Sequence, residues 1–192
     1  MNATVLLVMD VQRGIVGRFA DDPGYLERLS RAITAARAAG IAVVYVKVGF
    51  RPGHPEISAS NRSFSAVASS GGFAEDTPAA EIHPAVVPAP GEAVVTKRRV
   101  SAFTGSDLEV LLRGLGAGTL VLAGIATSGV VLSTLRQAAD MDYRLIVLED
   151  ACLDADPEVH RVLTQKVFPR QADVTTAAAW ATELVRQAAP AS

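Results

Sequence analysis

Short apolar segments alternate with amphipathic ones along this chain. Apolar runs at 4–9, 41–48, 93–96, 120–123 and 144–148 are rich in Val, Leu and Ile, which is typical of strands buried on both faces of a parallel sheet. A short sixth strand is predicted at 172–174. The segments between them carry apolar residues at helical spacing. This alternation predicts an α/β, three-layer Rossmann-like fold, with a six-stranded parallel sheet covered by helices on both faces.

The helix boundaries follow from capping residues. A helix is predicted at 25–39, closed by Gly40, and a second at 107–114, where Ser106 and Glu109 form a capping box. Helices at 128–141, 157–168 and 175–187 follow, and Ser128 is a candidate N-cap. Residues Gly49–Gly72 read as a long irregular loop over the strand ends, and loops of this length are usually functional or mobile.

Composition narrows the class of protein. A chain of 192 residues with 49% hydrophobic and 20% charged residues predicts one globular domain over 1–192. The net charge of −2 gives no electrostatic case for binding nucleic acid or an anionic membrane. The apolar N-terminal run is too short to span a membrane and no basic segment precedes it, so a cytoplasmic location is expected.

Polar residues follow several predicted strands. Asp10 follows the first strand, Lys97 follows the third, and a turn of small residues at 124–129 follows the fourth. The carboxyl ends of parallel strands lie on one edge of a sheet, so these groups can converge there. A buried carboxylate beside an ammonium can exchange a proton with a substrate. The alternative is a structural ion pair that only closes the end of the sheet.

The turn after the fourth strand is a second candidate site. The backbone N–H groups of Thr127, Ser128, Gly129 and Val130 would begin a helix and could face a carbonyl or oxyanion. The alternative is an ordinary strand-to-helix turn that binds nothing.

The remaining reactive or bulky residues give weaker signals. His54, His83 and His160 have no metal-ligand spacing. A single cysteine, Cys152, excludes an intramolecular disulfide and a multi-cysteine metal site, and reads as a small buried residue. Four phenylalanines could line a pocket or pack in the core: Phe19, Phe50, Phe64 and Phe103.

Taken together, these segments resemble the isochorismatase-like hydrolases, which include the nicotinamidases and other cysteine amidohydrolases. The resemblance rests on VLLVMDVQ around Asp10, on VVTKRRVSAFTGSDLEVLLRGLG with Lys97, Ser101 and Ala102, on LVLAGIATSGVVLSTLRQAADMDYRLIVLEDAC, and on DPEVHRVL. These segments cover almost the whole chain in the expected order. The resemblance implies a sheet of six parallel strands and a homodimer or higher homo-oligomer.

In the cysteine members of that family, an Asp, a Lys and a Cys carry out the chemistry. The resemblance assigns the first two places to Asp10 and Lys97 and the third to position 130, where this chain has Val. It also implies a cis peptide near Ile125–Ala126. The region KVGFRPGHPE does not match the metal-binding pattern of nicotinamidases, so we expect no metal, no other cofactor and no nicotinamidase activity.

The resemblance implies a small-molecule hydrolase that works without a covalent intermediate, as the true isochorismatases do on a vinyl ether. Asp10 would perform acid–base catalysis and Lys97 would keep it poised. Gln12 and Phe103 would position the substrate, and Arg51 and Arg99 are candidates to bind an anionic one. The alternatives are a pseudo-enzyme that binds a small molecule in the same pocket, or a purely structural subunit of an oligomer.

Overall fold

The computed structural model describes residues 3–18 and 22–188. Its strands are β1 (Ala3–Met9), β2 (Ala42–Val48), β3 (Ala93–Lys97), β4 (Ala117–Ile125), β5 (Arg144–Leu153) and β6 (Asp173–Thr175). Its α-helices are α1 (Arg13–Val16), α2 (Tyr25–Ala38), α3 (Ser65–Ser70), α4 (Leu108–Gly114), α5 (Leu132–Asp140), α6 (Pro157–Val162) and α7 (Ala177–Ala188). Short 3-10 or π-helical turns are η1 (Pro78–Ala80), η2 (Pro84–Val86), η3 (Thr127–Val131), η4 (Leu163–Val167) and η5 (Phe168–Arg170).

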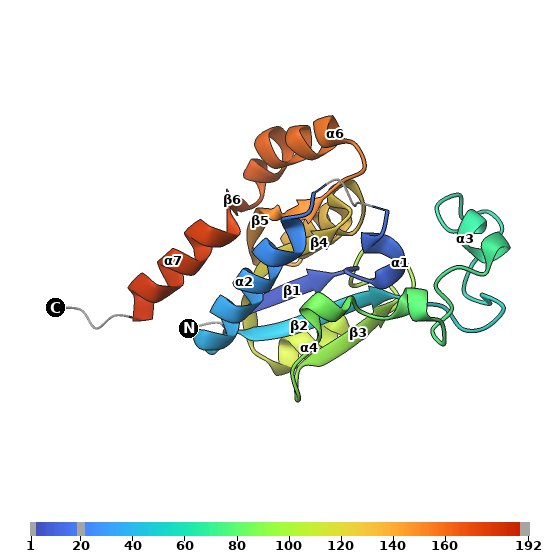
Figure 1. Ribbon diagram of the computed structural model, residues 1–192, viewed down its shortest axis with the longest axis horizontal. Coiled ribbons are helices and arrows are strands. Elements are labelled where there is room, and N and C mark those ends of the chain that lie inside the picture. Colours follow the sequence, from blue (N-terminus) through green and yellow to red (C-terminus); the bar gives the residue numbers. More distant parts are fainter. Residues whose placement is uncertain (1–2, 19–21, 189–192) are drawn as a thin grey trace.

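The strands form one parallel sheet in the order β3-β2-β1-β4-β5-β6, and Figure 1 shows β1 between its neighbours. The predicted six-stranded parallel sheet is therefore confirmed. The chain adds β2 and β3 on one side of β1 and then crosses to β4, β5 and β6 on the other. This reversal leaves a crevice at the carboxyl ends of β1 and β4, where ligands of open α/β sheets bind.

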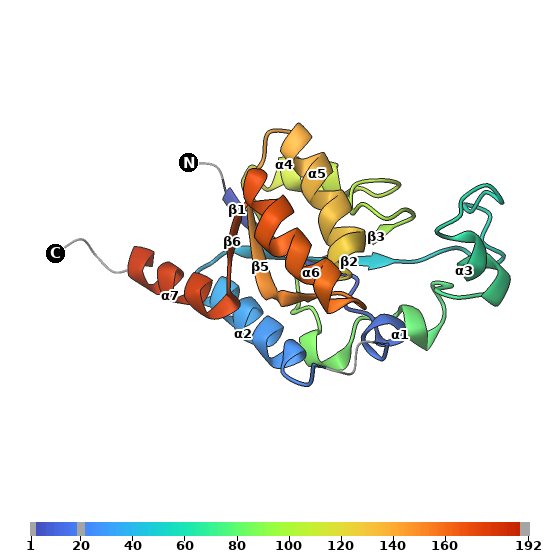
Figure 2. The same ribbon diagram turned by 90° about the horizontal axis from the view of Figure 1, so that it is seen from above.

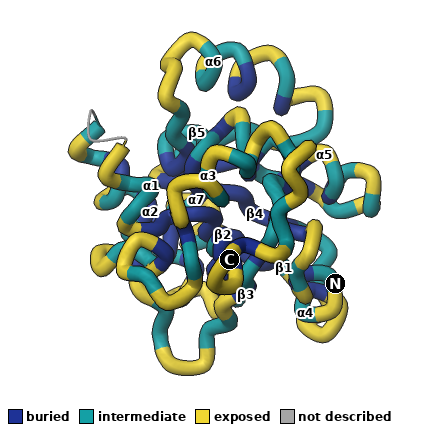
Figure 3. Tube along the Cα trace, turned by 90° about the vertical axis from the view of Figure 1, so that its right-hand side faces the viewer, coloured by how far each residue is buried: buried dark blue, intermediate teal, exposed yellow. Residues whose placement is uncertain are grey.

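Helices cover both faces of the sheet, as the sequence predicts. Alternate residues of β1 enter different cores: Leu7 packs with α4 and α5, and Leu6 packs with α2 and α7. Figure 2 shows α4, α5 and α6 on one side and α2 and α7 on the other. The buried part of the chain lies around β2 and β4 at the centre (Figure 3). Burial on both faces explains why the strands are almost wholly apolar.

Several element ends differ from the sequence prediction. The predicted helix at 128–141 is interrupted: η3 makes a π-helical turn, Gly129 leaves the helical region (φ −97°, ψ −106°), and α5 begins at Leu132. The strand predicted at 144–148 continues to Leu153 through a shift in register, so Cys152 pairs beside Gly124 inside the sheet. The helix predicted at 157–168 gives way to η4 and η5 after Val162. These changes arise where tertiary contacts override local preference.

The long loop after β2 is partly helical. Residues 49–77, which we call the arm, include α3 and a small apolar cluster in which Phe50 and Phe73 are buried and Phe64 packs against them. The Phe50 N–H donates to the Phe73 carbonyl (2.9 Å), which closes the arm at its base. Figures 1 and 2 both show α3 projecting beyond the strand ends. The arm therefore lies at the carboxyl edge of the sheet, as the sequence predicts.

Gly124 allows β1 and β4 to approach at the site's edge. Its φ is +143°, and a Cβ there would lie 2.1 Å from the Met9 carbonyl oxygen. We expect Gly124→Ala to lower the free energy of unfolding by about 1–3 kcal/mol, because backbone atoms would have to move. Urea unfolding of the variant and the wild type measures this change in the free energy of unfolding. Gly114→Ala is the matched control, because a Cβ at Gly114 meets nothing within 4 Å; an equal loss in both variants would contradict the close-approach argument.

Within the described residues, none of the helices combines the length and the apolar character needed to cross a membrane.

Candidate active site

Asp10 lies at the end of the central strand, where the sheet order reverses. It adopts a left-handed backbone conformation (φ +57°), which Asp tolerates better than most residues. Its N–H donates to the Val46 carbonyl on β2 (2.8 Å), so the turn of the chain is held against the neighbouring strand. The side chain is thereby fixed at the carboxyl edge of the sheet.

Lys97 is the last residue of the edge strand β3 and reaches past β2 to Asp10. Its Nζ lies 2.9 Å from Asp10 Oδ2, and the two side chains are only 2% and 8% exposed. Nζ also donates to the Arg99 carbonyl (2.9 Å). The structure therefore brings together the two charged residues that the sequence singled out.

The Asp10 carboxylate is only half satisfied. Its Oδ1 is buried without a hydrogen-bond partner in the described part of the chain. Burial raises the pKa of Asp10, and the charge and hydrogen bond of Lys97 oppose that rise. A buried oxygen without a partner is costly, and here it is an atom that can give or take a proton.

A pocket of about 210 Å³ opens over this ion pair. Asp10 and Lys97 line it, and the other lining residues come mainly from the ends of β2 and β4, from α1 and from the arm: Ile15, Arg18, Val48, Phe64, Phe73, Val100, Ile125, Ala126, Gly129 and Val130. Phe64, one of the predicted pocket phenylalanines, is among them, whereas Phe19 lies outside the described residues. A small molecule would meet mainly apolar walls, with the Asp10–Lys97 pair and Arg18 among them.

The turn after β4 forms one wall of this pocket. The Ile125–Ala126 peptide bond is cis, as the family resemblance implied. Val130 follows in η3 and is 2% exposed. It shares the pocket with Asp10 and Lys97 and presents an isopropyl group. The position therefore offers no side-chain nucleophile.

The N–H groups of this turn are engaged differently from the sequence expectation. The Ser128 N–H donates to Asp154 Oδ2 (2.6 Å), and the Gly129 N–H donates to the Ala126 carbonyl (3.1 Å). A helix start favours an anion, and here the chain's own Asp154 takes that place. Neither N–H is free to bind a substrate oxyanion in this conformation. Ser128 is also not the predicted N-cap, because Ala126 holds that position.

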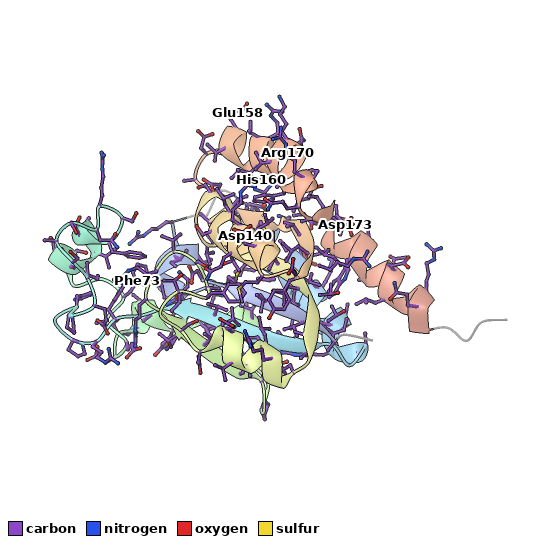
Figure 4. The ribbon with its side chains drawn as sticks, turned by 180° about the vertical axis from the view of Figure 1, so that it is seen from behind. Phe73, Asp140, Glu158, His160, Arg170 and Asp173 are labelled. Atoms are coloured by element: carbon purple, nitrogen blue, oxygen red, sulfur yellow. The ribbon has the colours of Figure 1, made fainter. Side chains whose placement is uncertain are left out.

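Thr127 is completely buried and faces away from the pocket. Its Oγ1 lies 2.8 Å from His160 Nδ1 on α6, which fixes the turn from behind; His160 lies above the sheet in Figure 4. Burial lowers the pKa of His160, against the opposing charges of Asp154 and Glu149. Sequence reasoning did not pair these residues, because 33 positions separate them.

Comparison with known proteins agrees with this geometry. The isochorismatase domain model matches residues 4–179. The chain belongs to the isochorismatase family. It is 36% identical over 178 residues to ureidoacrylate amidohydrolase RutB of Methylorubrum extorquens AM1, covering 81% of this chain and 72% of RutB. It is 34% identical to the isochorismatase family protein YecD of Escherichia coli O157:H7, covering 89% and 90% of the two chains.

Solved structures of the family share the fold. An isochorismatase family protein from Burkholderia thailandensis superposes with a TM-score of 0.81 at 28% identity, covering 95% of this chain and 96% of that one. The N-carbamoylsarcosine amidase of Thermoplasma acidophilum gives a TM-score of 0.70 at 27% identity, with 91% and 96% covered.

In this family member, Gln12 and Phe103 are placed away from the pocket. Gln12 is fully buried: its Nε2 donates to the carbonyls of Val48 (2.8 Å) and Ala80 (2.9 Å), and its Oε1 accepts from the Val48 N–H (2.9 Å). Phe103 packs in the core and stacks on Tyr143 at 6.3 Å between ring centroids. Both therefore contribute to the scaffold, and neither is among the residues that line the pocket.

Cys152 is likewise separate from the pocket. It is 1% exposed, and burial raises the pKa of its thiol to about 12. Among the histidines, His54 Nε2 lies 2.8 Å from the Gly72 carbonyl and ties the arm together. No three metal-ligating side chains meet anywhere in 3–18 or 22–188.

Arg18 is a pocket residue that sequence reasoning missed. It lies just after α1, a helix that the sequence gave no reason to expect, and its guanidinium carbon lies 5.8 Å from the centroid of the Phe73 ring on the arm. Arg51 and Arg99, the candidates from sequence, do not line the pocket. Arg51 pairs with Glu56 (2.7 Å), and Arg99 donates to the Glu56 carbonyl (2.8 Å).

Proposed function

We propose that this chain is a small-molecule hydrolase in which Asp10 performs acid–base catalysis and water is the nucleophile. The bond broken is an enol ether of the isochorismate type or a related bond that protonation activates. The observation that carries the proposal is the buried Asp10–Lys97 pair at 2.9 Å, with Asp10 Oδ1 left without a partner beside a small apolar pocket.

Burial raises the pKa of Asp10 and so favours the protonated form that can donate a proton. Protonated Asp10 would give its proton to the terminal vinyl carbon, forming an oxygen-stabilised cation. Water would add to that cation and return one proton to Asp10. Transfer of the hemiketal proton to the ether oxygen then breaks the C–O bond and releases an alcohol and a keto acid. Lys97 would hold Asp10 in place and stabilise its ionised form between these steps.

A covalent thioester is absent from this proposal because no thiol faces the pocket. We propose that Val130 occupies the place that the cysteine nucleophile holds in other members of the family. Cys152 does not replace it, since its thiol is buried elsewhere and its raised pKa keeps it protonated. Serine and threonine do not replace it either: Thr127 is buried against His160, and Ser128 is not among the pocket residues.

The named relatives favour a second class of substrate for the same site. RutB is a ureidoacrylate amidohydrolase, and a solved relative is an N-carbamoylsarcosine amidase. For such an amide, ionised Asp10 would take a proton from water as it attacks the carbonyl, and would pass that proton to the leaving nitrogen.

The alternative role is binding without turnover. Val130 makes the wall apolar, and the N–H groups of Ser128 and Gly129 are already engaged, as expected for a site that has lost its chemistry. Against this stands the buried ion pair, whose desolvation is costly unless the pair is used.

Steady-state assays of the wild-type chain on isochorismate, ureidoacrylate and N-carbamoylsarcosine separate these possibilities. Enol-ether hydrolysis by Asp10 predicts that, in D₂O, one solvent deuterium enters the methyl group of the keto acid product. Hydrolysis of the amides without hydrolysis of isochorismate would show that the substrate is an amide and not an enol ether. Tight binding of these compounds without turnover of any of the three substrates would contradict the hydrolase proposal and favour the binding role.

Val130→Cys tests whether the pocket keeps the environment of a thiolate. The new sulfur would lie beside Asp10 and Lys97 in the same pocket, so we expect it to react with iodoacetamide at neutral pH. Mass spectrometry of the intact chain should show one added carbamidomethyl group in the variant. Cys152 provides the internal control, because its buried thiol should stay unmodified in both proteins. An unreactive Cys at position 130 would contradict the idea that only the nucleophile has been exchanged.

A further inference from the structure

Arg18 places a positive charge at the mouth of the pocket. The side chain is exposed, and it rests over the ring of Phe73, which is 8% exposed and packs against Val48 and Phe50. Phe73 lies where the arm meets the body of the protein (Figure 4). The aromatic face favours a guanidinium above it and limits the directions that Arg18 can take.

This charge is not neutralised by the described part of the protein. Three charged side chains line the pocket: Asp10, Lys97 and Arg18. Asp10 and Lys97 neutralise each other at 2.9 Å. No carboxylate of residues 3–18 or 22–188 comes within ion-pair distance of Arg18. Among the described side chains that line the pocket, Arg18 therefore supplies one positive charge in excess.

The neighbouring arginines are committed to structure instead. Arg51 pairs with Glu56 (2.7 Å), Arg98 pairs with Glu75 (2.6 Å), and Arg99 donates to the Glu56 carbonyl (2.8 Å). The contacts of Arg98 and Arg99 attach the arm to the end of β3, and the Arg51–Glu56 pair lies within the arm. Arg18 alone among these four lines the pocket and keeps its guanidinium N–H donors available within the described structure.

We propose that Arg18 binds the carboxylate of a small substrate whose apolar or unsaturated body lies between Phe73 and Val130. The reacting bond would then lie inward, toward Asp10. A guanidinium suits a carboxylate because it can donate two parallel hydrogen bonds. This inference rests on the proposed function for the identity of the pocket, and it adds a substrate class and a residue that selects it.

A second cavity offers a competing role for Arg18. It has a volume of about 410 Å³, and its charged lining comprises two arginines and four carboxylates: Arg18, Arg28, Asp22, Glu149, Asp150 and Asp154. Its carboxylates would attract Arg18 and repel an anionic ligand. A test must therefore show both that Arg18 selects a carboxylate and that the carboxylate lies in the pocket with Asp10.

Equilibrium binding of benzoate and benzamide provides that test, because the two probes share a shape and differ in charge. We expect the wild-type chain to bind benzoate about tenfold or more tightly than benzamide, as one charge-assisted interaction supplies. Arg18→Gln should abolish this preference and leave benzamide unaffected. Arg18→Lys should keep part of it, since the charge remains and the planar fork is lost. NMR titration measures each Kd.

Arg62→Gln is the matched control, because Arg62 is exposed on the arm and is not among the pocket residues. It removes the same charge and should leave the preference intact. Val130→Phe should fill the pocket and weaken benzoate binding. Benzoate binding that survives Val130→Phe but not Arg18→Gln would place the ligand in the acidic cavity and overturn the proposal.

Three other results would also overturn it: no preference for benzoate in the wild type, equal losses of benzoate and benzamide in Arg18→Gln, or an equal effect of Arg62→Gln. Because the readout is binding, a chain that hydrolysed none of the assayed substrates would contradict the proposed function and leave this result unchanged. Loss of the benzoate preference with turnover retained on an uncharged substrate would contradict only the role of Arg18.

Discussion

Replacing Asp10 by Asn is expected to lower kcat/KM by about 10²–10⁴-fold, the usual contribution of a general acid or base. The amide cannot donate and accept the proton that the mechanism moves. Asn tolerates the left-handed backbone at this position (φ +57°) and the backbone N–H bond to Val46 remains, so the fold should form. Its stability should fall, because the buried Lys97 ammonium loses its counter-charge. Steady-state kinetics on the best substrate from the panel, with circular dichroism to check the fold, measure the effect.

Asp140→Asn is the matched control for this variant. Asp140 is exposed at the end of α5, and the change removes the same charge. It should leave kcat/KM unchanged. Turnover that persists in Asp10→Asn would remove Asp10 from the chemistry and leave the Asp10–Lys97 pair as a structural ion pair, the alternative that the sequence left open.

Lys97→Met should destabilise the protein by about 3–5 kcal/mol at neutral pH, because it leaves a buried carboxylate without its partner. Met fills much of the same volume, so lost packing contributes little. Lys97 is 2% exposed and Asp10 is 8% exposed, which means that solvent cannot replace the lost ammonium. Urea unfolding gives the change in the free energy of unfolding.

The loss should depend on pH in a defined direction. Burial already raises the pKa of Asp10 in the folded protein, and removing Lys97 removes the main opposing influence. The folded state then binds a proton more tightly than the unfolded state, in which the pKa of Asp is about 3.9. Stability is therefore retained below that pKa and lost as the pH rises through the higher folded-state pKa. The difference between Lys97→Met and wild type should shrink toward pH 4.

The double variant Asp10→Asn/Lys97→Met tests the cause. With no buried charge left, it should be more stable at neutral pH than Lys97→Met alone, and the two changes should be strongly non-additive. Equal destabilisation at low and neutral pH, or additive effects, would show that Lys97 contributes by packing and not by compensating Asp10.

Much of the architecture follows from local pattern. Val5, Leu7 and their neighbours form a continuous apolar run that only a strand covered on both faces can bury, and the strand–helix alternation dictates a parallel sheet. Asp10 and Lys97 stand out because a charge at the end of such a strand is costly unless it is paired. Their meeting at 2.9 Å follows from parallel topology, which brings strand ends to one edge.

The partners of the other polar groups could not be read from the sequence. Asp154 occupies the helix start at Ser128, His160 fixes Thr127 from behind, and Gln12 is hydrogen-bonded to Val48 and Ala80. Each of these bonds joins residues that local pattern does not relate. Which donor meets which acceptor depends on how α6 and η1 pack onto the sheet and on where the chain leaves β5.

The sequence by itself therefore determined the sheet, its two apolar faces and the ion pair at its carboxyl edge, since these depend on periodicity and on the cost of burying charge. Only the tertiary structure decided what surrounds that pair. The fold of the arm brings Phe73 to Arg18, and the break at Gly129, inside η3, comes directly before Val130 and ahead of α5. The physical reason is that a pocket is made by side chains from distant segments, whose relative positions depend on packing and not on local preference.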